Sequence, residues 1–477
     1  MNASGKRLDW WLVLGALCAG AAVRAAYLNT WGPWFDEVYF SVFARPWQSG
    51  GVNGFFDLLG WIHGNDVHPP VYFALLLYWI KLFGQSAVAL RLPSLLFGLA
   101  TIPAAYALGR DALGRRVGLA LAWLIALAPA HVWYSVEARP YALLTLLTTL
   151  SCWLCWRLLF GECKRGTLMA YAVVTVLLPG THHLGWFVIA GQAALAALHW
   201  KQADKRAITS PFIAGLIALP WLTFAFAQGG TRFRHLSTFS PTAINELLRF
   251  ITPAALIDPA WLRLVFDLAM AALLIGAIIV AVRDHRKSET AKYNVALFFF
   301  GFLLVPLAAL IAASLLRPLL HEKLGVMLLA PALAAPAWAA MRLPKRWVQF
   351  AAMALLLVAG ALSSLQVGAA IRKTPDYRAA HAYLASPEVR ELPVVLSATW
   401  WNATYLYYEP GERALFANDR PRLVDLLKQQ RPFFLLVETA TSTADSIIDS
   451  LNAQFDVERV RVFHRLWLYR LTPKPAP

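Results

Sequence analysis

The stretch that decides the fold is Trp34-Phe35-Asp36-Glu37, which follows closely on the apolar run 10–28. That run is long enough to cross a bilayer, so the two acidic residues stand at the mouth of a membrane protein. In a chain that is 59% hydrophobic and only 15% charged, adjacent carboxylates at this place are costly and usually functional. We therefore predict an extracytoplasmic active site at Asp36 and Glu37. The alternative is an exposed acidic pair at the water interface.

The composition of the 477 residues indicates an integral membrane protein. The 20 Trp and 15 Tyr suit the interfacial belts of such proteins. The net charge of +16 falls mostly in short gaps between apolar runs, which predicts anionic lipid headgroups as the partner and no nucleic acid. Three of the four cysteines lie inside apolar runs, so neither a disulfide framework nor a zinc site is expected.

The distribution of basic residues predicts about eleven spans. The apolar runs are 10–28, 70–84, 88–109, 116–134, 140–160, 167–181, 184–200, 207–227, 259–282, 292–316, 321–341 and 347–370. The run 70–84 is short and contains Lys81, so we interpret it as a juxtamembrane helix. Without it, every basic gap falls on one side, the cytoplasm. We expect an uncleaved signal anchor at the start, a cytoplasmic N-terminus and an extracytoplasmic C-terminus in the inner membrane.

A change of composition after about residue 373 predicts two domains. Residues 1–373 form the transmembrane domain, with a catalytic outer loop at 29–87, and residues 374–477 form a periplasmic domain. Strand-like runs at 394–398, 433–437 and 463–471 alternate with helical patterns in this second part. The expected fold class is thus an all-α polytopic membrane protein with juxtamembrane helices and a small C-terminal α/β domain.

Ionisable residues from distant loops gather on the predicted outer face. Asp36 and Glu37 can supply a general base, and cations opposite them can stabilise a departing phosphate. Arginine suits phosphate in particular, because its planar fork matches the phosphate oxygens. The candidates for binding a donor phosphate or substrate are His68, Tyr134, Glu137, Arg139, Arg317, His321 and Lys323.

Several of these residues also have structural interpretations. Glu137 and Arg139 can form an interfacial ion pair, and Lys323 and Arg24 can snorkel to the interface. We interpret Arg24 as a snorkelling residue. His182-His183 is expected to be a turn rather than a pair of metal ligands, because no carboxylate stands beside it in the sequence.

Four stretches together resemble those of the polytopic C-type glycosyltransferases, of the protein O-mannosyltransferase / lipid A aminoarabinose transferase type. They are Trp34-Phe35-Asp36-Glu37, His68-Pro69-Pro70-Val71-Tyr72-Phe73, Gly109-Arg110-Asp111-Ala112-Leu113-Gly114-Arg115-Arg116 and Tyr134-Ser135-Val136-Glu137-Ala138-Arg139-Pro140-Tyr141. Each is weak alone, but jointly they are specific, and the resemblance covers essentially the whole chain.

The resemblance implies an inverting transferase that moves a sugar from a polyprenyl-phosphate donor to an acceptor hydroxyl at the outer face of the cytoplasmic membrane. It implies Asp36 as the catalytic carboxylate, with Glu37 as its neighbour, and a phosphate ligand at His68. Relatives tend to carry an Arg-Tyr pair where this chain has Lys323-Leu324, so the aromatic hydroxyl is missing here. We expect no cofactor; a divalent metal is compatible with the chemistry but not required. The sugar, a hexose or pentose, and the acceptor, a lipid, glycan or protein, stay open.

Two other functions fit a polytopic protein: transport or flipping of a lipid-linked sugar, and a non-catalytic scaffold. A transporter is expected to show internal repeats and charges near the membrane midplane. In this sequence the charges cluster at one predicted face and no repeat is visible. A scaffold does not require acids and bases from distant loops, so glycosyl transfer is the prediction.

Overall fold

The computed structural model describes residues 3–46, 50–226, 240–285, 295–316, 319, 321–371 and 375–475, apart from short gaps at 398–403, 410, 412, 418, 440–447 and 450. The chain divides into two compact units. The helical unit comprises Met1–Leu28, Asn53–Gly84 and Ala89–Val367, and the sheet unit comprises Asn29–Val52, Gln85–Val88 and Gly368–Pro477. The sequence-based boundary at 373/374 stays a prediction. In the structure, the segment 29–52 groups with the C-terminal residues.

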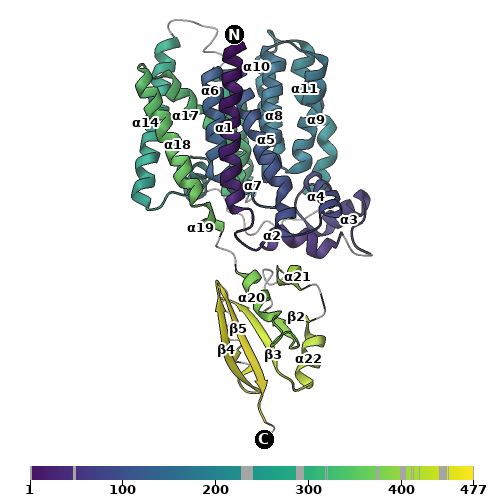
Figure 1. Cartoon of the computed structure of the whole chain (residues 1–477). Coiled ribbons are helices and arrows are strands. Elements are labelled where there is room, and N and C mark those ends of the chain that lie inside the picture. Colours follow the sequence, from purple (N-terminus) through teal and green to yellow (C-terminus); the bar gives the residue numbers. More distant parts are fainter. Residues whose placement is uncertain are drawn as a thin grey trace. The chain divides into compact units, whose positions relative to one another are not determined.

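The helical unit is a bundle of long apolar helices that run side by side (Figure 1). Its α-helices are α1 (Ala3–Tyr27), α3 (Phe55–Asn65), α4 (Val71–Phe83), α5 (Ala87–Leu113), α6 (Arg115–Leu127), α7 (Pro129–Ser135), α8 (Tyr141–Phe160), α9 (Arg165–Thr181), α10 (Gly185–Leu198), α11 (Lys205–Ala218), α12 (Leu222–Phe226), α13 (Pro241–Phe250), α14 (Ala260–His285), α16 (Val305–Leu316), α17 (Leu329–Arg342), α18 (Arg346–Leu365) and α19 (Val367–Ile371), which crosses the boundary of the unit. Three further turns of helix are η2 (Leu219–Trp221), η3 (Phe300–Leu304) and η4 (Glu322–Leu328). Many large apolar side chains on these helices are exposed, as lipid-facing residues are.

The structure supports a multi-pass membrane protein. Seven helices in the described ranges are long and apolar enough to cross a membrane, or eight if α6 and α7, bent by 57°, form one span. The predicted count of eleven is not confirmed. Part of the difference comes from α10, which has only 14 residues although the apolar run there is longer. A run of apolar residues can continue through a turn at which the helix ends, so the run is longer than the helix.

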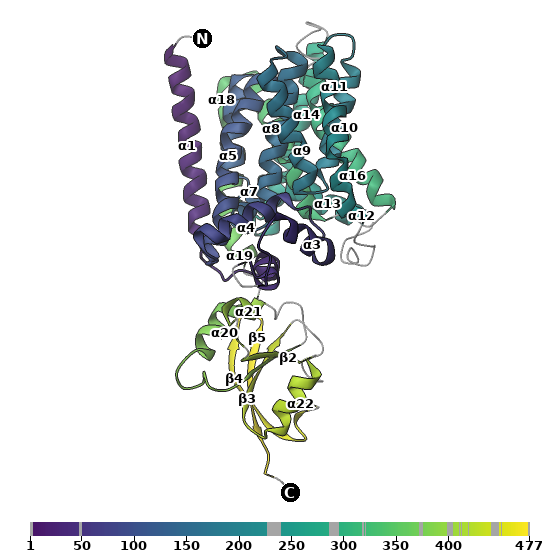
Figure 2. The ribbon, with the colours of Figure 1, turned by 90° about the vertical axis from the view of Figure 1, so that its right-hand side faces the viewer.

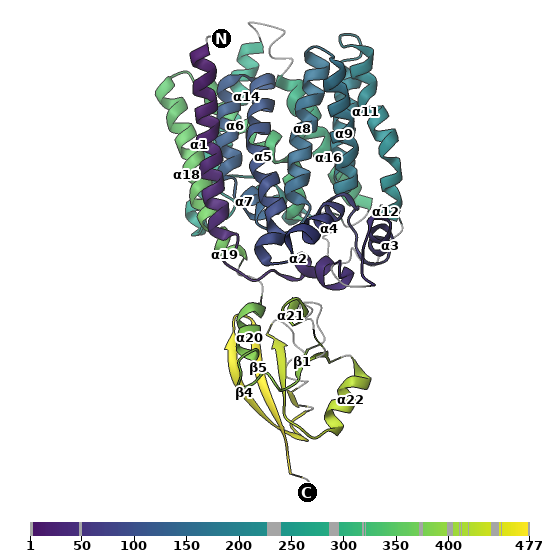
Figure 3. The same ribbon diagram turned by 45° about the vertical axis from the view of Figure 1, so that its right-hand side comes forward.

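The run 70–84 forms a short helix, as the sequence indicates. Helix α4 has 13 residues, begins after Pro69-Pro70 and ends at Gly84, whose φ of 76° favours glycine. At 1.5 Å per residue it is too short to cross the hydrocarbon core. It lies with α3 at the end of the helical unit where α7 is also found (Figures 2 and 3).

A buried arginine donates hydrogen bonds to backbone carbonyls at the break between α6 and α7. Proline at 129 cannot donate a backbone hydrogen bond, so the helix breaks and carbonyls near its end lose their partners. Arg24 of α1 donates to the carbonyl of Ala126 (2.8 Å) and lies 2.8 Å from His131 Nδ1. Its side chain is fully buried, so the interpretation of Arg24 as a snorkelling residue is wrong. It serves backbone carbonyls inside the bundle instead.

The sheet unit contains a five-stranded sheet in the order β2-β1-β3-β5-β4. The strands are β1 (Val394–Leu396), β2 (Ala414–Phe416), β3 (Phe433–Glu438), β4 (Phe455–Phe463) and β5 (Leu466–Pro473), and the helices are α2 (Phe35–Tyr39), its π-helical continuation η1 (Phe40–Ala44), α20 (Tyr377–Leu384), α21 (Tyr405–Tyr408) and α22 (Arg420–Lys428). Strands β2, β1 and β3 are parallel, and β5 and β4 complete the sheet as an antiparallel hairpin. Strand β3 is buried along its whole length, so the core of this unit lies on both faces of the sheet.

Candidate functional site

The two acidic residues of the sheet unit have different environments. They lie in the first turn of α2, within the segment 29–46, which we call the carboxylate loop. Glu37 Oε2 accepts the backbone N–H of Trp34 at 3.1 Å, and its side chain is buried. It therefore caps its own helix. Asp36 is partly exposed, so it is the carboxylate of this pair that a substrate can reach more readily.

The carboxylate loop is tied to the C-terminal part of the same unit by an arginine. Arg378 of α20 donates to the carbonyl of Asn29 (3.1 Å), to Asn29 Oδ1 (3.0 Å) and to the carbonyl of Trp31 (3.0 Å). The ring of Trp31 also lies 6.2 Å from that of His464. A single guanidinium thus fixes the loop just ahead of α2, although about 350 residues separate the partners.

His68 of the helical unit is held by a neighbouring carboxylate. Asp66 Oδ1 accepts the backbone N–H of His68 at 2.8 Å and lies 2.7 Å from His68 Nδ1. Both side chains are nearly buried. An acidic partner at this distance favours the protonated imidazole and fixes the orientation of the ring.

Arg139 stacks on the same imidazole. Its Nη2 atom lies 3.4 Å from each of the two ring nitrogens of His68, and a nitrogen equidistant from both at this range must stand over the ring face. The backbone of Arg139 is fixed as well. Its carbonyl accepts from Ser94 Oγ (3.3 Å), which also bonds the hydroxyl of Tyr72 (3.0 Å). The start of α8, α5 and α4 are thereby joined at one point.

The histidine pair forms the turn between α9 and α10, as expected, and it also reaches this group. The ring of His182 lies 5.2 Å from that of His68, while its Nδ1 accepts the backbone N–H of Leu184. His183 Nε2 donates to the carbonyl of Val67 at 3.1 Å. We call Asp66, His68, Arg139 and His182 the His–Arg cluster.

Burial and charge set the protonation of this cluster. Burial raises the pKa of Asp66, but the charges of His68 and Arg139 and the hydrogen bond from His68 more than offset it, so the pKa lies below its ordinary value. Burial, with the nearby His68 charge, lowers the pKa of His182 well below its usual range and that of His183 to about 4. At neutral pH, Asp66 is ionised and these two histidines are neutral. Arg139 carries a positive charge in this cluster, and the ionised Asp66 favours a second one on His68.

Tyr134 and Glu137 lie in the turn that carries Arg139. Both are buried, and the backbone N–H of Arg139 donates to the carbonyl of Glu137 at 2.8 Å. The ring of Tyr134 packs against Tyr141 with centroids 4.6 Å apart, and Tyr141 lies 5.8 Å from His182. The structure therefore brings Tyr134, Glu137 and Arg139 to the side of the bundle that carries His68.

The last predicted loop is only partly described. His321 caps η4, because its Nδ1 accepts the backbone N–H of Lys323 at 3.2 Å. Thr145 of α8 donates to the carbonyl of Val326, which joins η4 to the helix that follows Arg139. Lys323 is half-buried at the start of η4. Arg317 lies outside the described residues.

Comparison with known proteins identifies the fold. Residues 67–226 match the family model described as dolichyl-phosphate-mannose-protein mannosyltransferase. The chain resembles ArnT from Cupriavidus metallidurans over 98% of both chains, with a TM-score of 0.59 at 13% identity in the apo state and at 14% in the form bound to undecaprenyl phosphate. It also resembles the archaeal oligosaccharyltransferase AglB from Archaeoglobus fulgidus, over 92% of this chain and 70% of that one, with a TM-score of 0.51 at 11% identity. No curated protein sequence matches the chain significantly.

The chain has the fold of the C-type glycosyltransferases. The resemblance drawn from its four motifs is thereby confirmed. The residues 67–226 include His68, Tyr134, Glu137 and Arg139, which were singled out from the sequence. The predicted roles of all the candidate residues stay predictions.

Three residues of these contacts were not singled out as site residues from the sequence. Asp66 stands two residues before His68, a spacing that a turn can close, and this was an available signal. His182 was interpreted as a turn residue only, because its neighbours in the sequence carry no acid. Arg378 had no signal, since a contact between residues 29 and 378 cannot be read from either stretch.

Proposed function

We propose that the protein is an inverting glycosyltransferase that moves a sugar from a polyprenyl-phosphate donor to an acceptor hydroxyl. The observation that carries the proposal is the His–Arg cluster, a nearly buried imidazole clamped between Asp66 and Arg139. Its residues other than Asp66 lie within the stretch 67–226 that matches the mannosyltransferase family. The similar ArnT structure has been solved with undecaprenyl phosphate and AglB with a dolichol-phosphate and an inhibitory peptide, which supports a lipid-phosphate donor.

The donor phosphate is proposed to bind at the cluster. Arg139 offers a planar fork, and protonated His68 offers a second charged donor, so both match phosphate oxygens. Lys323 adds a point charge from the start of η4. In their nearly buried surroundings the contacts of Arg139 and His68 are stronger than in water. As the bond between sugar and phosphate breaks, negative charge grows on the departing phosphate, and the same cations stabilise it.

Asp36 is proposed as the general base. It removes the proton from the acceptor hydroxyl, and the oxygen attacks the anomeric carbon from the face opposite the phosphate. The carbon–oxygen bond to the phosphate breaks, the polyprenyl phosphate leaves, and the configuration at the anomeric carbon is inverted. Glu37 suits a supporting role because its carboxylate already caps α2. A phosphate leaving group needs cations rather than a protonating acid, so one base is sufficient.

The C-terminal part of the sheet unit is proposed to set the position of Asp36. Arg378 holds the backbone at Asn29 and Trp31, which are the residues that lead into α2. A loop fixed at this point loses less conformational entropy when the acceptor binds.

The proposed location is the cytoplasmic membrane of the cell, with transfer at its outer face. The N-terminus lies inside and the C-terminal part outside, because all the basic gaps then face the cytoplasm. A periplasm-dependent reporter fused after Leu113 tests this orientation, since it is expected to report the cytoplasm. An external signal there places α4 across the membrane and overturns the orientation.

The direct test is transfer by the purified protein. Detergent-solubilised protein is incubated with a panel of radiolabelled polyprenyl-phosphate sugars and an extract of envelope acceptors. Release of free polyprenyl phosphate together with labelled acceptor establishes transfer. Mass spectrometry of envelope glycans from a deletion strain then identifies the sugar and the acceptor. Movement of the intact donor across a vesicle membrane without cleavage instead establishes a flippase, the alternative function.

A further inference from the structure

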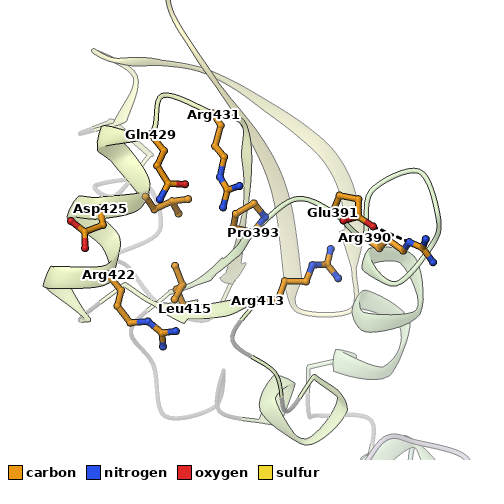
Figure 4. Close-up of a pocket in the computed structure, with 10 residues that line it drawn as sticks. Arg390, Glu391, Pro393, Arg413, Leu415, Arg422, Asp425, Gln429 and Arg431 are labelled. Atoms are coloured by element: carbon orange, nitrogen blue, oxygen red, sulfur yellow. Dashed lines mark hydrogen bonds and ion pairs between the residues drawn. The ribbon is translucent and has the colours of Figure 1, made fainter.

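The sheet unit contains a cavity that the proposed reaction does not use. Its volume is about 570 Å³, within the roughly 300–1,000 Å³ range of small-molecule sites. Four arginines line it, together with two acids, a glutamine and an apolar floor (Figure 4). The lining residues are Arg390, Glu391, Pro393, Arg413, Leu415, Arg422, Asp425, Leu426, Gln429 and Arg431. We call this cavity the arginine groove.

The groove follows from the topology of the sheet. Arg413 directly precedes β2, and Arg390 and Arg431 precede β1 and β3. Because these three strands are parallel, the residues ahead of them share one edge of the sheet. Helix α22 follows β2 and supplies Arg422, and Gln429 caps the end of this helix. Arginines from four separate segments are therefore placed around one cavity.

The arginines of the groove differ in their contacts. The side chain of Arg413 is held in place, because its guanidinium donates to the carbonyls of Leu384 (2.8 Å), Val389 (3.0 Å) and Leu392 (2.9 Å). Arg390 pairs with exposed Glu391 at 3.1 Å, a surface contact of small energy. Arg422 and Arg431 are also exposed, and they precede and follow Gln429 in the chain.

The side chains give the groove a positive interior. Figure 4 shows Gln429 and Arg431 directed into the space between α22 and the strand ends, whereas Asp425 points to the outer side of α22. Asp425 also lies 4.0 Å from Lys428, which partly offsets its charge. Pro393, Leu415 and Leu426 form an apolar floor. Planar forks above an apolar floor suit an anionic sugar, with its acid group on the arginines and its C–H face on the floor.

We propose that the arginine groove binds a saccharide that carries a phosphate or carboxylate group, as a holding site for an anionic acceptor. The assignment to the acceptor rests on the proposed function: the groove belongs to the same unit as Asp36, the proposed base for the acceptor hydroxyl. A single phosphate fills only a small part of a cavity of about 570 Å³, so the size favours a whole sugar unit.

The test is isothermal titration of the full-length protein in detergent with glucose 6-phosphate, glucose and inorganic phosphate. We expect 1:1 binding of glucose 6-phosphate, weakened at least about tenfold in the double variant Arg422→Gln/Arg431→Gln, because charge-assisted contacts are lost. The matched control is Arg459→Gln/Arg470→Gln, which removes two exposed charges from β4 and β5 outside the groove. The variant Arg139→Ala tests whether the ligand binds instead at the His–Arg cluster, where the donor phosphate is proposed to bind.

The outcomes are distinct. Binding that survives in the control and in Arg139→Ala but is lost in the groove variant supports the proposal. Equal weakening in the control shows a general charge effect and overturns it. Loss only in Arg139→Ala assigns the ligand to the cluster and also overturns it. Inorganic phosphate binding as tightly as the sugar phosphate, or no binding at all, removes the saccharide site.

Transfer kinetics test the link to the acceptor. In the groove variant the KM for an anionic acceptor is expected to rise about tenfold, with the KM for the donor unchanged. An unchanged acceptor KM overturns the assignment to the acceptor. Wild-type protein that binds glucose 6-phosphate in the groove but transfers no sugar refutes the proposed function and leaves the binding site standing.

Discussion

The two units divide the proposed chemistry between them. The helical unit places its cations inside the bundle, where Arg139 and His68 are nearly buried and share Asp66 as a counter-charge. The sheet unit carries Asp36 in a short surface helix whose approach is fixed by Arg378. The match to the mannosyltransferase family ends before the C-terminal part of the sheet unit and begins after α2. The part of the chain that resembles this family therefore includes His68 and Arg139, the proposed ligands of the donor, but not Asp36, the proposed base.

The largest expected effect is that of Asp36→Asn. The change is nearly isosteric and keeps hydrogen bonding, but an amide cannot accept the acceptor's proton. Turnover should fall by the roughly 10²–10⁴-fold that a positioned general base contributes, with donor binding intact. Single-turnover transfer and donor titration measure the two properties separately.

Glu37→Gln is the matched control for this variant. It should cost less than Asp36→Asn, because Glu37 caps α2 and the amide oxygen can still accept the N–H of Trp34. If Glu37→Gln alone is inactive, the two roles are exchanged. If Asp36→Asn transfers sugar at the wild-type rate, the base lies elsewhere and the division of chemistry between the units is wrong.

In the helical unit, Arg139→Ala removes the guanidinium group of the His–Arg cluster. A phosphate in nearly buried surroundings loses a charge-assisted partner worth about 1.5–3 kcal/mol, so kcat/KM for the donor should fall at least about tenfold. The KM for the acceptor should not change. Arg157→Ala, on the same helix α8 but in its last turn, is the control for the loss of an arginine. Equal losses in both variants assign Arg139 to folding rather than to the donor.

Arg378→Ala tests whether the C-terminal part of the sheet unit positions the base. Three hydrogen bonds to Asn29 and Trp31 disappear, so the carboxylate loop should become less ordered. We expect kcat to fall about tenfold, as a small displacement of a catalytic group costs, with the donor KM unchanged. Arg378→Lys should recover only part of this loss, because an ammonium cannot span the three acceptors as a planar fork does.

The control for this variant is Arg459→Ala, which removes an exposed arginine from β4 of the same unit. A donor KM that changes together with kcat contradicts a role confined to the acceptor side. Hydrogen exchange of the peptide that contains α2 supplies a readout independent of activity. Faster exchange there is expected for Arg378→Ala alone.

The sequence predicted the elements that depend on local pattern. The short helix after Pro69-Pro70, the buried strand β3 and the motifs around His68 and Arg139 are all readable from a few consecutive residues. Strand β4 was not predicted, because its exposed residues Asp456, Glu458, Arg459 and Arg461 hide the alternation that marks a strand. The count of spans was not confirmed, because a hydrophobicity pattern does not register a turn between two helices.

The site was predictable only in part, because contacts between residues that are distant in the sequence leave no local pattern. Arg139 and His68 came from separate motifs, and chemistry alone suggested that they meet. The contact of Arg378 with Asn29 joins residues whose local patterns say nothing of each other. Arg24 was misread because a lone arginine near a helix end gives the same pattern whether it points to the interface or into the bundle.

The smallest expected effect, and the one that depends on pH, is that of Asp66→Asn. The pKa of Asp66 lies below its ordinary value in the folded protein. Its ionised form therefore stabilises the fold above the unfolded pKa of about 3.9, and this stability is lost as the pH falls through the folded pKa. Asp66→Asn should lower the melting temperature at neutral pH and flatten its decline in acid. Thermal unfolding in detergent from about pH 7 to about pH 3 measures this difference.

Asp66→Asn is also expected to weaken donor binding, and this loss should become smaller as the pH falls. Without the carboxylate, His68 loses the partner that favours its protonated form, so the KM for the donor should rise several-fold near neutral pH. Lowering the pH toward about 6 should restore part of the loss, because the imidazole then protonates without help. If Asp66 has only a structural role, lowering the pH will not restore the KM for the donor in Asp66→Asn. A donor KM with the wild-type pH profile in Asp66→Asn shows that His68 does not bind the phosphate as a cation, and leaves Arg139 and Lys323 to do so.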